Sequence, residues 1–199
     1  LHMGVTTAGT LVFVPAGTDA SPLRTLALVD RQGRDTPLSA PERAYDGARL
    51  SPDGTRIAVS IRDQENDIWT WDLALQTLAR LTFDADMDIC PVWTPDGRRV
   101  VFASSRSGAY NLYARDVDGA AGDVRLTSGA NTQLPGSVTP DGAYVVGHEV
   151  RPQTQSDLVR FALAPGAGAA LAPAEDLVQT PFNEWSAEVS PDGRFVAYQ

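Results

Sequence analysis

The sequence has 199 residues, of which 43% are hydrophobic and 8% aromatic, a composition typical of a globular domain with a substantial core and not of a disordered chain. Its 25 acidic side chains outnumber 16 basic ones, all arginine, and the net charge of −9 argues against a groove that binds nucleic acid. The apolar runs are too short to cross a membrane, so we expect a soluble chain without a membrane segment.

The first three residues, Leu1 to Met3, are interpreted as a cloning remnant, and residues 4–199 as the folded part. A native leader could have been removed with the cloning, so the compartment is left open, with the periplasm or another extracytoplasmic space, as part of a larger protein, as the candidate. Residues 4–40 contain three segments of strand character, and their expected ranges are 10–14, 23–29 and 36–39. They match the last three strands of the later units, so we predict a first unit that lacks its inner strand.

The next unit, residues 48–82, contains the tetrapeptide Ser51 to Gly54, followed by a β-branched run. Proline at the second position and glycine at the fourth suit a tight turn that returns the chain into a strand. The turn recurs at residues 94–97, 139–142 and 190–193, about 45 residues apart, a spacing typical of propeller blades. The corresponding predicted blades are residues 48–82, 91–127, 136–177 and an incomplete 187–199.

These units predict an all-β fold, a β-propeller of four-stranded antiparallel blades with about four to five blades in this chain. Residues 164–174 are rich in Pro, Gly and Ala and are expected to form a surface loop. Three ways of completing the ring stay open: a four-bladed ring with one strand left over, a piece of a larger ring, or a symmetric homodimer. The leftover strand favours the last two.

The repeated pattern resembles the TolB-like family of β-propeller repeats over nearly the whole chain. The residues that carry the resemblance are Trp93 to Gly97, Ser104 to Gly108, Asn111 to Tyr113 and Arg125 to Thr127. More narrowly, Asp67 to Asp72 and Arg194 to Gln199 resemble the propeller region attached to bacterial membrane serine/threonine kinases. That resemblance implies a propeller that continues past residue 199, although no kinase motif is present in this sequence.

Superposing the repeats on their turns makes Tyr45, Asp88, Gln133 and Glu184 equivalent positions in the loops that enter the blades. Such loops gather around the mouth of the central channel in a propeller. We therefore predict a ligand site at the channel mouth, for a protein or a small molecule. Its predicted residues are Tyr45, Asp46, Gln133, Glu184 and Trp185.

A second hypothesis places a divalent cation such as Ca²⁺, Mn²⁺ or Zn²⁺ at the same rim. The predicted metal ligands are Asp86, Asp88, Glu184 and His148, a set rich in oxygen atoms with one imidazole. His148 and Glu149 are the candidate catalytic residues of a metal-dependent hydrolase for esters or phosphoesters. Solvated loop carboxylates are the simpler interpretation of these acids. We therefore expect a binding, scaffold or sensor propeller, with the hydrolase as the alternative.

Overall fold

The structure, a computed structural model, describes residues 3–5, 11–13, 23–63, 66–119, 121–163 and 173–199. Every regular element in these ranges is a β-strand, which confirms the predicted all-β fold. None of the described residues forms a helix that is long and apolar enough to cross a membrane. Outside the described residues lie positions 1 and 2 of the expected remnant, positions 10 and 14 of the first predicted strand, and 164–172 of the predicted loop.

The strands form five antiparallel sheets, four of them with four strands each. The first sheet contains β1 (Met3–Val5), β2 (Leu11–Phe13), β3 (Ala27–Val29) and β4 (Asp35–Pro37). The second contains β5 (Tyr45–Leu50), β6 (Arg56–Arg62), β7 (Asn66–Asp72) and β8 (Thr77–Arg80). The third contains β9 (Asp88–Trp93), β10 (Arg99–Ser104), β11 (Asn111–Asp116) and β12 (Val124–Arg125).

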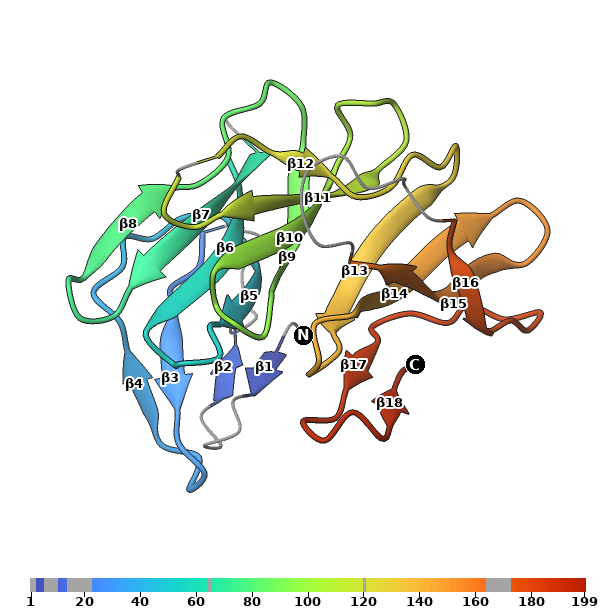
Figure 1. The fold of residues 1–199 in the computed structure, drawn as a ribbon. Helices are drawn as coiled ribbons and strands as arrows, with labels where there is room; N and C mark the ends of the chain where they lie inside the picture. Colours follow the sequence, from blue (N-terminus) through green and yellow to red (C-terminus); the bar gives the residue numbers. More distant parts are fainter. Residues whose placement is uncertain (1–2, 6–10, 14–22, 64–65, 120, 164–172) are drawn as a thin grey trace.

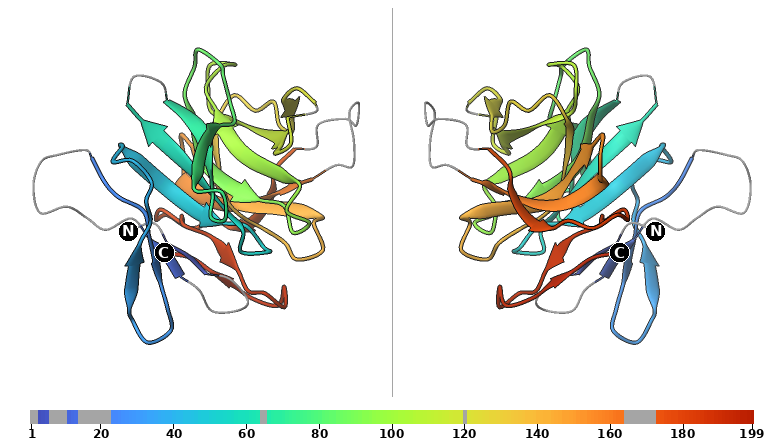
Figure 2. Two further views of the ribbon diagram at one scale, coloured as in Figure 1. Left: turned by 90° about the vertical axis from the view of Figure 1, so that its left-hand side faces the viewer. Right: turned by 90° about the vertical axis from the view of Figure 1, so that its right-hand side faces the viewer.

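The fourth sheet contains β13 (Thr132–Val138), β14 (Tyr144–Arg151), β15 (Gln155–Ala162) and β16 (Glu175–Val178). The fifth has two strands, β17 (Glu188–Val189) and β18 (Val196–Ala197). The five sheets stand side by side around a common centre, with β1, β5, β9, β13 and β17 on the inside (Figure 1). In the side views the first and fifth sheets lie next to each other below the other three (Figure 2).

The ring of sheets is not closed. Among the described residues, no strand pairing joins the first sheet to the fifth, because β1 pairs with β2 and β17 with β18. The four-bladed ring completed by the last inner strand is therefore not formed. Completion of the ring by a symmetric homodimer stays a prediction.

The first sheet has four strands, although the sequence predicts three. Met3 lies opposite Phe13, and Val5 opposite Leu11, so β1 is the inner strand that was expected to be missing. The prediction is wrong here because a strand of three residues with no turn tetrapeptide before it has too little pattern to be recognised. Met3, interpreted above as part of a cloning remnant, lies in this strand.

Apolar side chains of alternate residues hold neighbouring sheets together. In β6, Ile57 and Val59 pack with the cluster that faces the first sheet, whereas Ala58 packs with the cluster shared with the third. In β14, Val145 and Val146 likewise face opposite neighbours. This alternation follows from the two-residue period of a strand, and full burial of such side chains contributes about 1.5–3 kcal/mol each. The interfaces between sheets are thus the hydrophobic core.

The repeated tetrapeptides form the turns between the first and second strands of four sheets. In the first copy the Gly54 N–H donates to the Ser51 carbonyl oxygen at 2.9 Å, and Gly54 has a φ of 72°. The Asp53 carboxylate accepts from the Ser51 hydroxyl at 2.6 Å and from the Thr55 N–H at 3.1 Å. These hydrogen bonds hold the pKa of Asp53 below its usual value. The turn glycine supplies the left-handed conformation that the sequence predicted.

The pKa is lowered in all four turn aspartates, and the side-chain hydrogen bond from the preceding Ser or Thr is the largest cause. The folded pKa therefore lies below the unfolded value near 3.8, so these groups stabilise the fold above that pH. We expect the free energy of unfolding to fall as the pH drops below 3.8 through the folded pKa values. Urea unfolding between about pH 2 and pH 6 measures this effect.

The matched control carries asparagine at all four turn positions, Asp53, Asp96, Asp141 and Asp192. Asparagine keeps the acceptor oxygen but cannot titrate. We expect this variant to lose less stability than the parent as the pH falls from about 4 to about 2. Equal losses in the two proteins would show that the turn aspartates do not cause the acid sensitivity.

Candidate functional site

The inner strands enclose a channel with two chambers that share four residues: Arg49, Val92, Gly136 and Glu188. The mouth chamber, about 470 Å³, lies toward the loops that enter the sheets. The residues that line it outside the shared set include Gly47, Cys90, Leu134, His148, Ser186 and Tyr198. The hairpin chamber, about 340 Å³, opens among the Pro-Asp-Gly turns at the other end. Both volumes lie in the range of ligand pockets, about 300–1,000 Å³.

Irregular backbone at one equivalent position of the inner strands shapes the mouth chamber. Gly47, Cys90 and Ser186 have φ values of 63°, 57° and 56°, and the position is Pro135 in the fourth sheet. The register of β5 and β9 shifts at these residues, as in a β-bulge. A bulge takes backbone groups out of the regular ladder, and the Cys90 N–H donates to the Ser60 hydroxyl of the second sheet at 3.2 Å.

Cys90 is the sole cysteine of the chain. Burial is the main cause that raises the pKa of its thiol to about 11. The thiol is therefore largely protonated at neutral pH, and only its small thiolate fraction reacts with an alkylating reagent. Cys90 is thus a small side chain in the wall of the mouth chamber.

The four equivalent positions predicted at the channel mouth lie at or near the starts of the inner strands, but their side chains are buried. Tyr45 and Asp88 are 0% exposed, Gln133 is 3% and Glu184 is 4% exposed. They point between the sheets, where each one has a polar partner within the protein. The Tyr45 hydroxyl donates to the Pro41 carbonyl oxygen at 2.6 Å.

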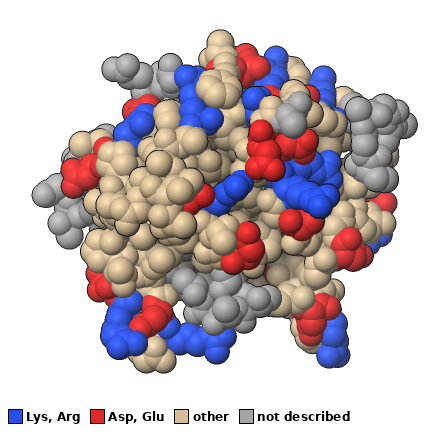
Figure 3. All heavy atoms as spheres, turned by 60° about the vertical axis from the view of Figure 1, so that its left-hand side comes forward, with Lys and Arg blue, Asp and Glu red and all other residues tan. Residues whose placement is uncertain are grey.

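Asp88 belongs to an ion-pair network that is centred on Arg106. The guanidinium lies 3.1 Å from Asp88, 2.5 Å from Asp123 and 3.1 Å from Asp84. It also lies 4.5 Å above the centre of the Tyr113 ring. Burial raises the pKa of Asp88, while hydrogen bonds and the charge of Arg106 act in the opposite direction. Other arginines also lie beside carboxylates on the face shown in Figure 3.

Glu149 is held by three donors. Its carboxylate accepts from Gln133 at 2.6 Å, from Arg151 at 2.9 Å and from Asn131 at 3.2 Å. Burial acts to raise the pKa of Glu149, but these hydrogen bonds outweigh it and keep the pKa below the usual value. Glu149 is therefore ionised at neutral pH and has no proton to donate, which does not suit a general acid.

His148 is the predicted site residue that lines the mouth chamber. Burial lowers the pKa of its ring, so the imidazole is neutral at pH 7, with one nitrogen that donates and one that accepts. Within the described part of the chain, no hydrogen bond to this ring is found. His148 is therefore able to bond to a ligand in the chamber.

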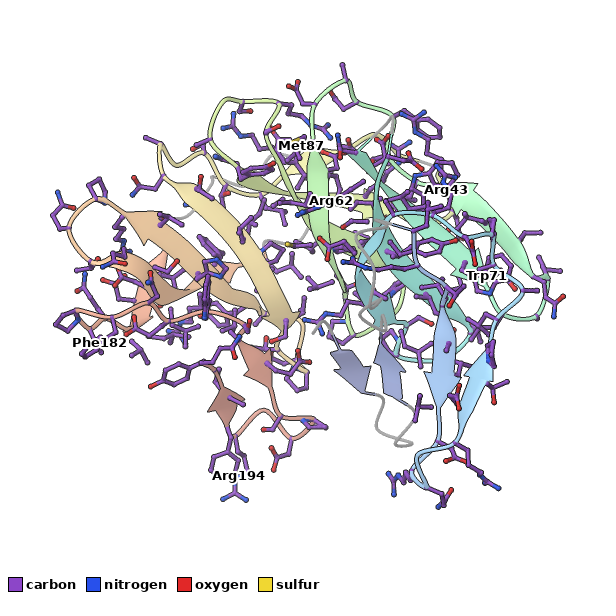
Figure 4. All side chains as sticks on the ribbon, turned by 180° about the vertical axis from the view of Figure 1, so that it is seen from behind. Arg43, Arg62, Trp71, Met87, Phe182 and Arg194 are labelled. Carbon is purple, nitrogen blue, oxygen red and sulfur yellow. The ribbon has the colours of Figure 1, made fainter. Side chains whose placement is uncertain are left out.

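The predicted metal ligands do not come together. Among the described residues, no three His, Cys, Asp or Glu side chains form a group that could hold a metal ion. Met87, between the two candidate aspartates, lies far from Phe182, which is two residues before Glu184 (Figure 4). The physical reason is that equivalent positions of different blades are related by rotation about the channel. They lie at the same level along the channel but at different positions around it, and their side chains enter different interfaces between sheets.

The two other predicted ligand residues are partly accessible. The Asp46 carboxylate pairs with Arg62 at 3.1 Å. Trp185 is 50% exposed, and its backbone exchanges hydrogen bonds of 2.8 and 3.1 Å with Gln199. This pairing lengthens the hairpin of β17 and β18.

Sequence reasoning missed Arg49 and Glu188. Their side chains lie 3.4 Å apart, although they come from β5 and β17 on different sides of the channel. A signal was present, since the turn alignment places Arg49, Val92, Ser137 and Glu188 at one position of the repeat. Two opposite charges at a position that is otherwise apolar or small mark a place where the blades differ.

Four-stranded antiparallel sheets set side by side around a channel define this protein as a β-propeller. The sequence model of the TolB beta propeller domain family matches residues 29–199. The chain belongs to that family, as its repeats indicated.

A curated relative, an uncharacterized protein of Agrobacterium fabrum, is 35% identical over 97 residues, which are 48% of this chain and 33% of that protein. TolB from Acinetobacter baumannii superposes with a TM-score of 0.80 at 22% identity, over 98% of this chain and 47% of that one. The β-propeller domain of the Trilobed protease from Pyrococcus furiosus, which has an open velcro topology, gives 0.59 at 14% identity, over 93% and 58%.

The chain thus spans about half the length of the TolB structure, and its match covers about a third of the curated relative. The similarities to solved structures concern the fold. The narrower resemblance to propellers attached to bacterial kinases gains no support from these relatives.

Proposed function

We propose that this protein is a recognition module that receives an extended segment of a protein partner in its mouth chamber. The observation that carries the proposal is the neutral His148 ring, which faces the chamber without a hydrogen bond from the described residues. A group that both donates and accepts suits the amide groups of a peptide.

The backbone of the chamber wall supports the same proposal. The strands β5, β9 and β13 are the edge strands of their sheets, and each is paired on one side, to β6, β10 and β14. The other side faces the channel with backbone donors and acceptors, which are the groups that an extended peptide uses to bind an edge strand. Leu134, Pro91 and Tyr198 add apolar surface to the same chamber.

The hydrolase alternative has no comparable support. Among the described residues, no three of its metal candidates form a group, Asp88 is paired with Arg106, and Glu149 accepts three hydrogen bonds. Binding is therefore the function that the described geometry supports best.

The proposal predicts that peptides selected from a displayed random library will depend on the mouth chamber. We expect His148→Ala and Tyr198→Ala to weaken the affinity of a selected peptide by about tenfold or more, as loss of one good contact does. Isothermal titration calorimetry measures the affinities.

Leu75→Ala is the matched control, because Leu75 is 72% exposed in the turn between β7 and β8, away from the chamber. Its affinity should equal that of the parent. Selected peptides whose affinity is the same for the parent and both chamber variants would contradict the proposal.

A further inference from the structure

The hairpin chamber is a second site, and its walls come from the repeat itself. Each of the four turns contributes its proline: Pro52, Pro95, Pro140 and Pro191. The turns of successive sheets touch, since a Cβ on Gly97 would lie 3.9 Å from Pro52, and one on Gly193 would lie 3.4 Å from Pro140. The four turns therefore lie in a row along this end of the channel.

Apolar side chains continue the wall below the prolines. Leu50, Trp93, Val138 and Val189 line the chamber. The Trp93 indole N–H donates to the Arg49 carbonyl oxygen at 2.9 Å, and the side chain is 7% exposed. This bond fixes the indole against β5. The wall is thus largely apolar and held in place by the fold.

The floor carries one positive and one negative charge side by side. Arg49 and Glu188 lie 3.4 Å apart, and their side chains are 24% and 53% exposed. The same guanidinium donates to the Gly136 carbonyl oxygen at 3.2 Å, which holds it on this side of the channel. Both charged groups are therefore within reach of a ligand that enters from the turns.

We propose that the hairpin chamber binds a free α-amino acid with an apolar side chain. The carboxylate of the ligand pairs with Arg49, its ammonium group pairs with Glu188, and its side chain lies among the turn prolines and Trp93. A few precisely placed polar groups in an apolar pocket of this volume, about 340 Å³, are typical of small-ligand sites.

The choice of a zwitterion follows from the two charges. A simple anion would be attracted by Arg49 and repelled by Glu188, and a simple cation would meet the reverse. An uncharged apolar ligand would remove water from both charges without forming an ion pair or a hydrogen bond with either of them. A zwitterion places an opposite charge beside each group, so the ligand extends the existing pair of Arg49 and Glu188.

Calorimetric titration of the purified protein with L-phenylalanine tests the proposal. We expect one saturable site for phenylalanine. Three compounds that each lack one of the recognised groups should bind about tenfold more weakly or not at all. N-acetylphenylalanine lacks the ammonium group, phenylalanine methyl ester lacks the carboxylate, and glycine lacks the side chain. Absence of binding at about 10 mM phenylalanine would overturn the proposal, as would equal affinity for the acetylated or esterified compound.

Two variants locate the site, with a third as the control. Arg49→Met and Glu188→Gln should each weaken phenylalanine binding by about tenfold, with the fold checked by far-UV circular dichroism. His148→Ala, which alters the mouth chamber alone, should leave phenylalanine binding unchanged. In the parent protein, Trp93 lines the hairpin chamber, so its fluorescence should change on saturation with phenylalanine. Unchanged binding in both charge variants would place the amino acid elsewhere, whatever the outcome of the peptide experiments at the mouth chamber.

Discussion

Replacement of Arg106 by alanine is expected to lower the free energy of unfolding by about 3–5 kcal/mol. The side chain is 15% exposed, and its removal leaves the Asp88 carboxylate, 0% exposed, without its cation, while Asp123, 11% exposed, keeps only Arg115 among the described residues. A buried charge without a partner is costly, and the contact with the Tyr113 ring is lost as well. Equilibrium unfolding in urea measures the change.

Arg62→Ala is the matched control for this prediction. Arg62 also pairs with an aspartate, Asp46, but its side chain is 49% exposed, so the loss should be below about 1 kcal/mol. Changing Asp88 to Asn together with Arg106 to Met should recover part of the stability, because neither charge is then left alone. If Arg106→Ala costs no more than Arg62→Ala, the network does not have the structural role assigned to it.

Gly136→Ala is expected to loosen the hairpin of β17 and β18 from the rest of the protein. A Cβ at this position would lie 2.4 Å from the Ala187 carbonyl oxygen and 3.2 Å from its Cβ, so β13 and β17 must move apart. Such overpacking costs about 1–3 kcal/mol, and here it falls on the contact between the fourth and fifth sheets. The Val189 N–H, which donates to the Ser137 hydroxyl at 2.9 Å, should exchange faster with solvent.

Gly122→Ala provides the comparison for Gly136. A Cβ at Gly122 meets no atom within 4 Å, so this variant should keep the stability and the exchange rate of the parent. Both properties can be followed by hydrogen exchange and thermal unfolding. Equal protection of Val189 in the two variants would contradict the close approach of the strands.

The fold could be predicted because its signal is local. The tetrapeptide Ser51 to Gly54 and its three later copies determine turns through the φ preferences of Pro and Gly and the acceptor of Asp, and a strand with a two-residue period follows each one. β1 escaped the prediction because three residues cannot establish a period. Closure of the ring is not local, and the sequence left three alternatives.

The candidate site was harder to predict, because equivalence in a repeat gives a residue's height along the channel but not the direction of its side chain. Asp88 and Gln133 are equivalent, yet each is buried in its own interface. Arg49 and Glu188 come from different blades and meet because their long side chains reach across the channel. The sequence shows that these residues differ between blades but not that they touch.

The central claim is that the mouth chamber binds a protein segment, and alkylation of Cys90 tests it most directly. Cys90 is the sole cysteine and lines this chamber, so one reaction reports on one place. A peptide selected from the library is added, and the rate of alkylation by a small neutral reagent at about pH 9, where more of the thiol is ionised, is followed by mass spectrometry. We predict that the peptide slows the reaction, with half of the full protection at its calorimetric Kd. An unchanged rate of alkylation at saturating peptide would contradict the claim.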